Sequence, residues 1–94
     1  MAISVKLIGV LRHVVGADRL SVEYRADFTV RKLLEDINAQ APGLKGNLID
    51  PHLENPLLVT LILVNAMDTS MLNGLETILQ DGDEIVLIPI VHGG

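Results

Sequence analysis

The sequence predicts an α+β fold in which a four- or five-stranded mixed sheet packs on one main helix. Three observations predict it. Apolar and polar residues alternate in Ile3–Leu7 and Leu20–Tyr24, which is the period of half-buried strands. Apolar residues recur at helical spacing after Thr29. Two more runs of strand length, Val59–Asn65 and Glu84–Pro89, are almost continuously apolar. The first of them is expected to be a strand covered on both faces.

The first two strands should form an N-terminal hairpin. The first is expected from Ile3 to about Gly9, followed by a loop that contains Gly16 and Asp18. Leu20–Tyr24 repeats the alternation and is the expected antiparallel partner.

The main helix should begin just after Thr29, whose hydroxyl suits an N-terminal cap. Its apolar stripe has the spacing i, i+3, i+4 and i+7. The stripe consists of Val30, Leu33, Leu34 and Ile37. Pro42-Gly43 should end the helix, since proline disfavours helical geometry in the residue before it.

The second half should alternate loops and strands. Dense Gly, Asn and Pro predict a loop over residues 44–56, with room for one helical turn at Pro51–Glu54. Residues 67–79 should be irregular, with a short helix or turn near Leu75–Leu79. Asp81-Gly82-Asp83 predicts a turn, and Pro89 is expected to stop the last strand. A flexible tail should follow over about residues 90–94.

These elements predict one domain over residues 1–94, because so short a chain buries a single core. The last strand gains two neighbours if it lies inside the sheet. Placing it parallel to the first strand lets all strands share one helix-covered face. That arrangement is a β-grasp fold.

Composition excludes several classes of function. The formal net charge of -5 disfavours nucleic acid and anionic membrane as partners. The chain has no cysteine, which excludes disulfides, thiolate metal sites and sulfur carried on a side chain. The first 16 residues do not resemble a signal peptide and the apolar runs are too short to span a membrane, so we expect a cytoplasmic protein.

Internal residues do not predict catalysis by this chain. His13, His52 and His92 are scattered without the spacing of metal ligands, and we expect ordinary surface or loop histidines. Asp81 and Asp83 could serve as an acid/base or cation site, but turn formation explains them more simply. We therefore expect that this chain is not itself a catalyst and that it binds no metal or cofactor.

The tail is the candidate site. Gly93-Gly94 after an apolar strand and a proline presents a slim carboxylate that can enter a narrow channel in another protein. Because a carboxylate is a poor acyl donor, a partner would have to activate it first. Terminal glycines are also common in flexible ends, so the pair alone is a weak signal.

The wider sequence makes the signal specific. The stretch from Leu79 to Pro89, followed by Val91-His92-Gly93-Gly94, resembles the C-terminal signature of the MoaD/ThiS family of sulfur carriers. Val5–Gly16, Thr29–Leu34 and Val64-Asn65 also resemble segments of that family. The chain departs from it at Pro89-Ile90, where two prolines are usual, and at Ala66, where glycine is common.

The resemblance implies that a ubiquitin-activating-type adenylyltransferase uses ATP to adenylate Gly94, which then becomes a thiocarboxylate. The expected acceptor is the molybdopterin synthase large subunit, as in molybdenum cofactor synthesis. Thiamine synthesis and tRNA thiolation are alternatives, as is attachment to lysines as a protein modifier. A β-grasp binding module without covalent chemistry remains a third hypothesis.

The strand pattern also predicts a docking surface. If Ile3, Val5 and Leu7 face the helix, then Ile8, Val86 and Ile88 face away from it. Those three form an exposed apolar patch unless an insertion loop covers them. We expect the partner to contact this patch. The other expected contacts are Arg12, which could equally be a solvated charge, and Pro89, Val91 and His92 near the tail.

Overall fold

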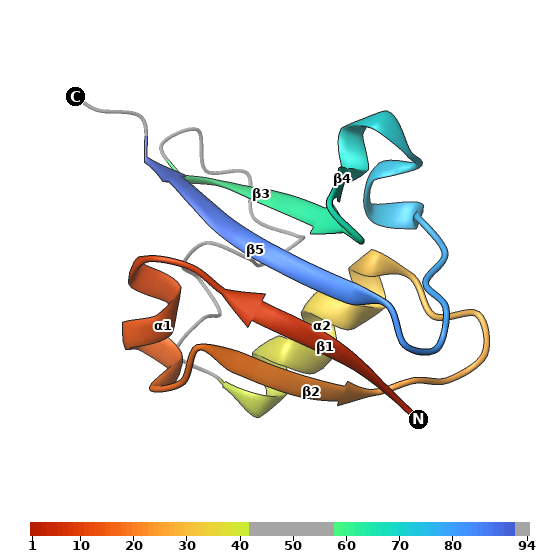
Figure 1. The fold of residues 1–94 in the computed structure, drawn as a ribbon, viewed down its shortest axis with the longest axis horizontal. Helices are drawn as coiled ribbons and strands as arrows, with labels where there is room; N and C mark the ends of the chain where they lie inside the picture. Colours follow the sequence, from red (N-terminus) through yellow and green to blue (C-terminus); the bar gives the residue numbers. More distant parts are fainter. Residues whose placement is uncertain (42–57, 92–94) are drawn as a thin grey trace.

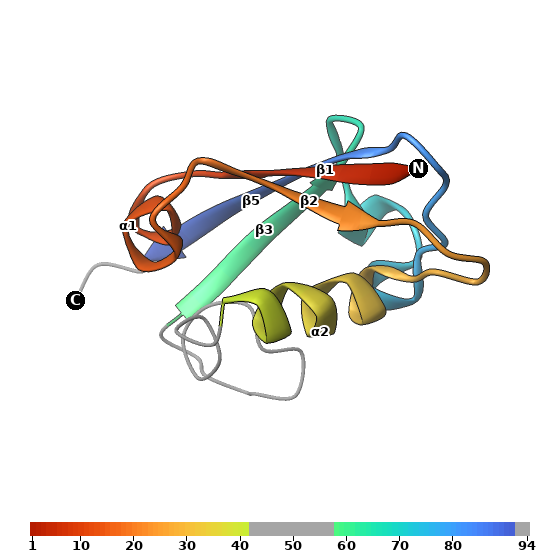
Figure 2. The ribbon, with the colours of Figure 1, turned by 90° about the horizontal axis from the view of Figure 1, so that it is seen from below.

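A five-stranded mixed sheet forms one layer of the molecule and a helix forms the other (Figures 1 and 2). The computed structural model describes residues 1–41 and 58–91. The strand order is β2-β1-β5-β3-β4. The strands are β1 (Ala2–Leu7), β2 (Arg19–Glu23), β3 (Leu58–Val64), β4 (Met67–Asp68) and β5 (Glu84–Val91). The predicted β-grasp fold is confirmed.

Strand β5 is the central strand. It runs parallel to β1, with Val5 opposite Ile85 and Leu7 opposite Leu87. On its other side it is antiparallel to β3 over the full length of both strands. The last strand therefore lies inside the sheet and parallel to the first, as the sequence predicted.

The core lies between the sheet and helix α2 (Val30–Gln40). Alternate residues of the central strands face the helix because successive side chains of a strand point to opposite faces. Phe28 is fully buried beside them and is the only phenylalanine in the chain. The fully buried aliphatic residues are Ile3, Val5, Leu7, Leu11, Val30, Leu33, Ile37, Leu79, Ile85 and Leu87.

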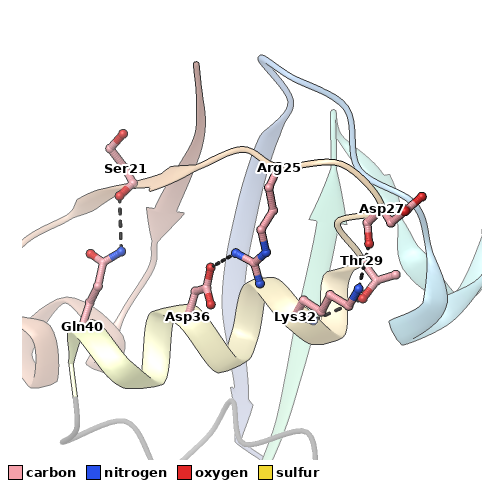
Figure 3. Close-up of polar contacts among 7 residues, drawn as sticks. All are labelled: Ser21, Arg25, Asp27, Thr29, Lys32, Asp36 and Gln40. Carbon is pink, nitrogen blue, oxygen red and sulfur yellow. Dashed lines mark hydrogen bonds and ion pairs between the residues drawn. The ribbon is translucent and has the colours of Figure 1, made fainter.

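Helix α2 begins as the sequence predicted. Oγ1 of Thr29 accepts a hydrogen bond from the backbone N–H of Lys32 at 3.2 Å, which satisfies one of the free donors of the first turn. Nζ of Lys32 donates to the backbone oxygen of Asp27 at 3.1 Å (Figure 3). The helix start is therefore tied to the segment that leads into it.

Two side chains join α2 to the edge of the sheet (Figure 3). Arg25 donates to Asp36 at 2.6 Å and also lies over the Phe28 ring, 4.3 Å from its centroid. The hydrogen bond to Asp36 raises the pKa of Arg25. Gln40 donates to the backbone oxygen of Ser21 at 3.5 Å, so one outward carbonyl of the edge strand β2 is satisfied within the molecule.

A short helix replaces part of the expected loop. Strand β1 ends at Leu7 rather than near Gly9, and α1 (Val10–Val15) follows. Gly9, with φ 63°, opens the turn, and Gly16 ends the helix in the left-handed conformation. Leu11 is the only buried residue of this helix. A six-residue helix with one buried side chain has no apolar repeat from which it could be predicted.

Proline does not stop the last strand, contrary to expectation. Strand β5 continues through Pro89 to Val91, opposite Thr60 and Leu58 of β3. The backbone N–H of Ile8 donates to the oxygen of Leu87, so Leu87, and by alternation Pro89, turn their main-chain groups toward β1. Pairing with β1 ends at Leu87, so the N–H that proline lacks has no strand to meet. The tail therefore begins two residues later than predicted.

The stretch expected to be irregular contains short ordered elements. After β4 come two 3-10 turns, η2 (Thr69–Met71) and η3 (Gly74–Glu76). The expected helical turn thus lies at Gly74–Glu76, where it overlaps the first two residues of the predicted range Leu75–Leu79. Leu79 instead enters the core, and its N–H donates to the oxygen of Phe28.

The loop predicted over residues 44–56 lies outside the described residues. Within the described residues, no helix has the length and hydropathy needed to cross a membrane.

Candidate functional site

A hydrogen-bonded clasp fixes the start of β5. The side-chain amide of Asn65 donates to Oδ1 of Asp83 at 2.9 Å, and its oxygen accepts from the N–H of Glu84 at 2.9 Å. Oδ2 of Asp83 accepts from the N–H of Gln80 at 2.8 Å, which closes the turn. Gly82 adopts φ 87° within that turn. The described geometry supports a structural role for Asp83, as its place in the predicted turn indicated.

The face of the sheet away from α2 carries an apolar patch. Val86 and Ile88 of β5 point to this face because Ile85 and Leu87 are buried on the other. Across the ladder they lie opposite Leu63 and Leu61 of β3. The four side chains are partly exposed. We name them the open-face patch.

Ile8 lies at the edge of this patch. It follows β1, and its N–H donates to the oxygen of Leu87 at 3.1 Å, which places it beside Ile88 in the parallel register. Its side chain is partly exposed. The structure therefore brings together three residues that the sequence analysis selected. Their role in binding stays a prediction.

The turn before α1 packs against the end of β5. A Cβ built on Gly9 would lie 3.3 Å from Cγ of Pro89, closer than most such contacts. Pro89 is partly exposed, with its ring against this turn. The point where β5 leaves the sheet is thereby fixed by a glycine and a proline in contact.

The structure describes only some of the remaining residues that were predicted to contact a partner. Arg12 is an exposed residue of α1, beside the end of β5 (Figure 1), and the described residues show no ion pair with it. Val91 closes β5 opposite Leu58. His92, Gly93 and Gly94 lie outside the described residues, so the expectations placed on them stay predictions.

No metal centre is found in the described part of the chain. No group of three or more His, Asp or Glu residues there has positions suited to holding an ion. What the described geometry offers is a rigid strand that leads directly into the last three residues, with an apolar surface beside its exit.

Comparison with known proteins identifies the family. The model of the ThiS family matches residues 5–94. The chain belongs to the ThiS family. Because the match covers nearly the whole chain and includes its last residue, the resemblance of the C-terminal segment to sulfur carriers is confirmed.

Two relatives of this ThiS-family chain are similar over their full length. Small archaeal modifier protein 3 of Haloferax volcanii is 30% identical, with all of both chains covered. Sulfur carrier protein CysO of Mycobacterium tuberculosis is 32% identical, also with all of both chains covered. The family thus includes small proteins named as carriers and others named as modifiers.

A solved structure places such a carrier in a complex. In the crystal structure of the BexX/CysO complex of Amycolatopsis orientalis, the similar chain is 29% identical, with a TM-score of 0.74. The alignment covers 99% of this chain and all of the other. The comparison confirms the fold and shows a related protein bound to a partner.

Sequence reasoning missed two features of the site. Leu61 and Leu63 belong to the open-face patch, but their run was interpreted as covered on both faces. The alternation of Ile62 and Val64 into the core would have indicated them. The contact between Gly9 and Pro89 joins distant parts of the chain, and only the parallel pairing of β1 with β5 reveals it.

Proposed function

We propose that this protein is a sulfur carrier whose reactive group is the carboxylate of Gly94. The membership in the ThiS family, matched through residue 94, carries the proposal. The described geometry supports it, because the central strand of a rigid sheet leads directly to the last three residues. The end-to-end similarity to CysO, which is named a sulfur carrier, gives further support.

The chemistry has two steps. In a partner of the ubiquitin-activating type, the Gly94 carboxylate attacks the α-phosphorus of ATP and releases pyrophosphate, which gives an acyl adenylate. Hydrosulfide then attacks the acyl carbon, the bond to AMP breaks, and a thiocarboxylate remains. Adenylation is needed because oxide is a poor leaving group, whereas AMP is a good one. This chain supplies the acyl group, and its partner supplies the catalysis.

Docking on that partner is proposed to use the open-face patch. The complex of the related CysO with BexX supports docking of this fold on a partner protein. Val86 and Ile88 lie on the strand that leads to the tail, so a surface that binds them also positions the last residues. Ile8, Arg12, Pro89, Val91 and His92 would extend the contact around the strand's end.

Intact-mass spectrometry tests the carrier hypothesis. The purified chain is incubated with an activating enzyme, ATP and sulfide, and the expected result is a gain of about 16 Da as sulfur replaces oxygen. Two control variants, one without Gly94 and one with an alanine added after it, should gain nothing. Both should unfold at the same denaturant concentration as the parent, because a chain end contributes little to folding. Sulfur loading of either variant would contradict the role of Gly94.

A protein modifier is the second candidate, and the similarity to small archaeal modifier protein 3 favours it. It shares the adenylation step but ends in an isopeptide bond to a lysine. An N-terminally tagged chain recovered from its own cells separates the two. Bands of higher mass with Gly94 on lysines indicate a modifier, and a free thiocarboxylate indicates a carrier. A terminus that stays unmodified with enzyme and ATP supplied favours a non-covalent binding module.

The acceptor pathway is a finer proposal. The resemblance suggests the molybdopterin synthase large subunit, with thiamine synthesis and tRNA thiolation as alternatives. Deleting the gene and measuring molybdopterin, thiamine and thiolated tRNA in the same cells distinguishes them. Loss of molybdopterin alone is the expected result, and loss of either other product instead would reassign the pathway.

A further inference from the structure

A second apolar surface lies at the end of the molecule where β5 begins. Four large apolar side chains there are unusually exposed: Met67 at 50%, Met71 at 79%, Leu72 at 41% and Ile78 at 60%. We name them the distal patch. Met67, Leu72 and Ile78 line one hollow of about 360 Å³, which Val64 also lines. Single exposed apolar residues are common, but a group around one hollow is typical of a binding surface.

The backbone that presents Met67 is conformationally demanding. Val64 pairs with Met67 across a two-residue turn in which Asn65 has φ 49° and Ala66 has φ 69°. Such turns favour glycine at the second position, and alanine with a positive φ is unfavourable. The turn is nonetheless held in place by the bonds of Asn65 to Asp83 and Glu84.

Side-chain hydrogen bonds also hold the backbone of residues 68–77, which carries Met71 and Leu72. Oδ1 of Asp68 accepts from the N–H of Ser70 at 2.8 Å and caps η2. Oγ1 of Thr77 accepts from the N–H of Asn73 at 3.0 Å and donates to the oxygen of Gly74 at 2.7 Å. The exposed apolar side chains therefore stand on an ordered backbone. Because methionine side chains adapt readily in shape, the surface suits an apolar partner.

The charge around this patch is predominantly negative. Residues 65–84 contain no Lys, Arg or His, and their acidic residues are Asp68, Glu76, Asp81, Asp83 and Glu84. Two arginines from elsewhere reach this set: Arg31 pairs with Glu76 at 2.8 Å and Arg19 approaches Glu84 at 3.9 Å. Asp68, Asp81 and Asp83 show no ion pair among the described residues. A second copy of this chain would bring acid against acid, whereas a basic partner would be attracted.

The distal patch is far from the tail. The eight residues of β5 span about 25 Å at roughly 3.3 Å per residue, with the distal patch at the start and the exit at the end (Figure 1). It also differs from the open-face patch, which faces away from α2. The distal patch is therefore separate from the surface proposed to present the tail.

From these observations we infer that the distal patch docks a basic amphipathic segment of a partner protein. Apolar side chains on one face of the segment fill the hollow between Met67, Leu72 and Ile78. Lysine or arginine side chains on its flanks meet the acidic rim. The inference does not depend on the chemistry proposed for Gly94.

Nuclear magnetic resonance titration tests this inference. The probe is a synthetic amphipathic peptide of about 14 residues, with leucines at i, i+3, i+4 and i+7 and lysines elsewhere. Amide shifts are expected to change mainly in residues 64–84, and affinity should fall as salt rises to about 0.5 M. A peptide with glutamate in place of lysine should not bind. Shifts confined to the open-face patch, or equal binding of the glutamate peptide, would overturn the inference.

Matched variants make the test specific. The double variant Met67→Gln/Ile78→Gln should weaken peptide binding at least about tenfold, as loss of central apolar contacts does. Both side chains are at least half exposed, so the variant should keep the parent's melting temperature and its sulfur loading at Gly94. The control Val86→Gln/Ile88→Gln should leave peptide binding unchanged. Self-association of the parent in sedimentation, abolished by Met67→Gln/Ile78→Gln, would instead assign the surface to a second copy and overturn the proposal.

Discussion

The two ends of β5 are held in different ways. At its start, β5 lies between β1 and β3, and Asn65 and Asp83 fasten the turn that leads into it. Beyond Leu87 it keeps only β3 as a neighbour and rests against Gly9 through Pro89. The first part of β5 thus belongs to the core of the sheet, and its last part leads to the tail. Stability should depend mainly on the first end.

The largest expected effect on stability comes from a β5 side chain that faces the core. Ile85 is fully buried, so Ile85→Ala should lower the free energy of unfolding by about 3 kcal/mol in urea titration. Ile88→Ala makes the same change on the open face and should cost less than about 1.5 kcal/mol, because part of the side chain already contacts water. Equal losses would mean that the open face is covered.

A smaller effect is expected where the strand leaves the sheet. Gly9 has φ 63° and ψ -135°, a conformation that side chains rarely adopt, so Gly9→Ala should cost about 2 kcal/mol. Gly16 has φ 82° with open space around it, and Gly16→Ala should cost about 1 kcal/mol. Repeating Gly9→Ala in a Pro89→Ala background isolates the contact between them. Additive losses would show that the two residues do not interact.

The side-chain hydrogen bonds of Asn65 at the start of β5 should contribute less to stability than the glycine at position 9 does. Asn65→Gly keeps the positive φ accessible and removes two side-chain hydrogen bonds, so we expect a loss of about 1.5 kcal/mol in thermal or urea unfolding. An unchanged stability would mean that water replaces both bonds without cost. The clasp would then not distinguish the two ends of the strand.

The smallest expected effect has the opposite sign. Ala66, next to Asn65, has φ 69° and is exposed, so Ala66→Gly relieves backbone strain and should stabilise the protein by about 0.5 kcal/mol. Asn65→Gly and Ala66→Gly form a matched pair. Both place glycine in the same turn, but the first should destabilise the protein and the second should stabilise it. Destabilisation by Ala66→Gly would show that the turn is not strained.

Much of this fold could be predicted because its main elements have strong periodicity. The helix after Thr29 and the alternating strands were found at nearly the observed bounds, and β5 was correctly placed parallel to β1. Helix α1 was missed because one buried residue, Leu11, gives no repeating pattern. The end of β5 was missed because proline normally stops a strand, and only the end of the pairing with β1 at Leu87 shows that the missing N–H of Pro89 faces no strand on that side.

The candidate site was predicted in part for similar reasons. Val86, Ile88 and Ile8 followed from alternation along single strands, and the structure places them together. The distal patch could not be predicted, because its four residues come from short turns without periodicity. Their exposure depends on how η2 packs beside β3 and η3 packs beside α2, which is a property of the tertiary structure.

The position of β5 between two strands also has a mechanical consequence. A pull on the last residues is transmitted along β5, parallel to its axis, and so loads the hydrogen bonds to β1 and β3 in shear. Many bonds then share the force, whereas a pull across an edge strand would open them one after another. The domain therefore resists unwinding when its terminus is pulled along the axis of β5.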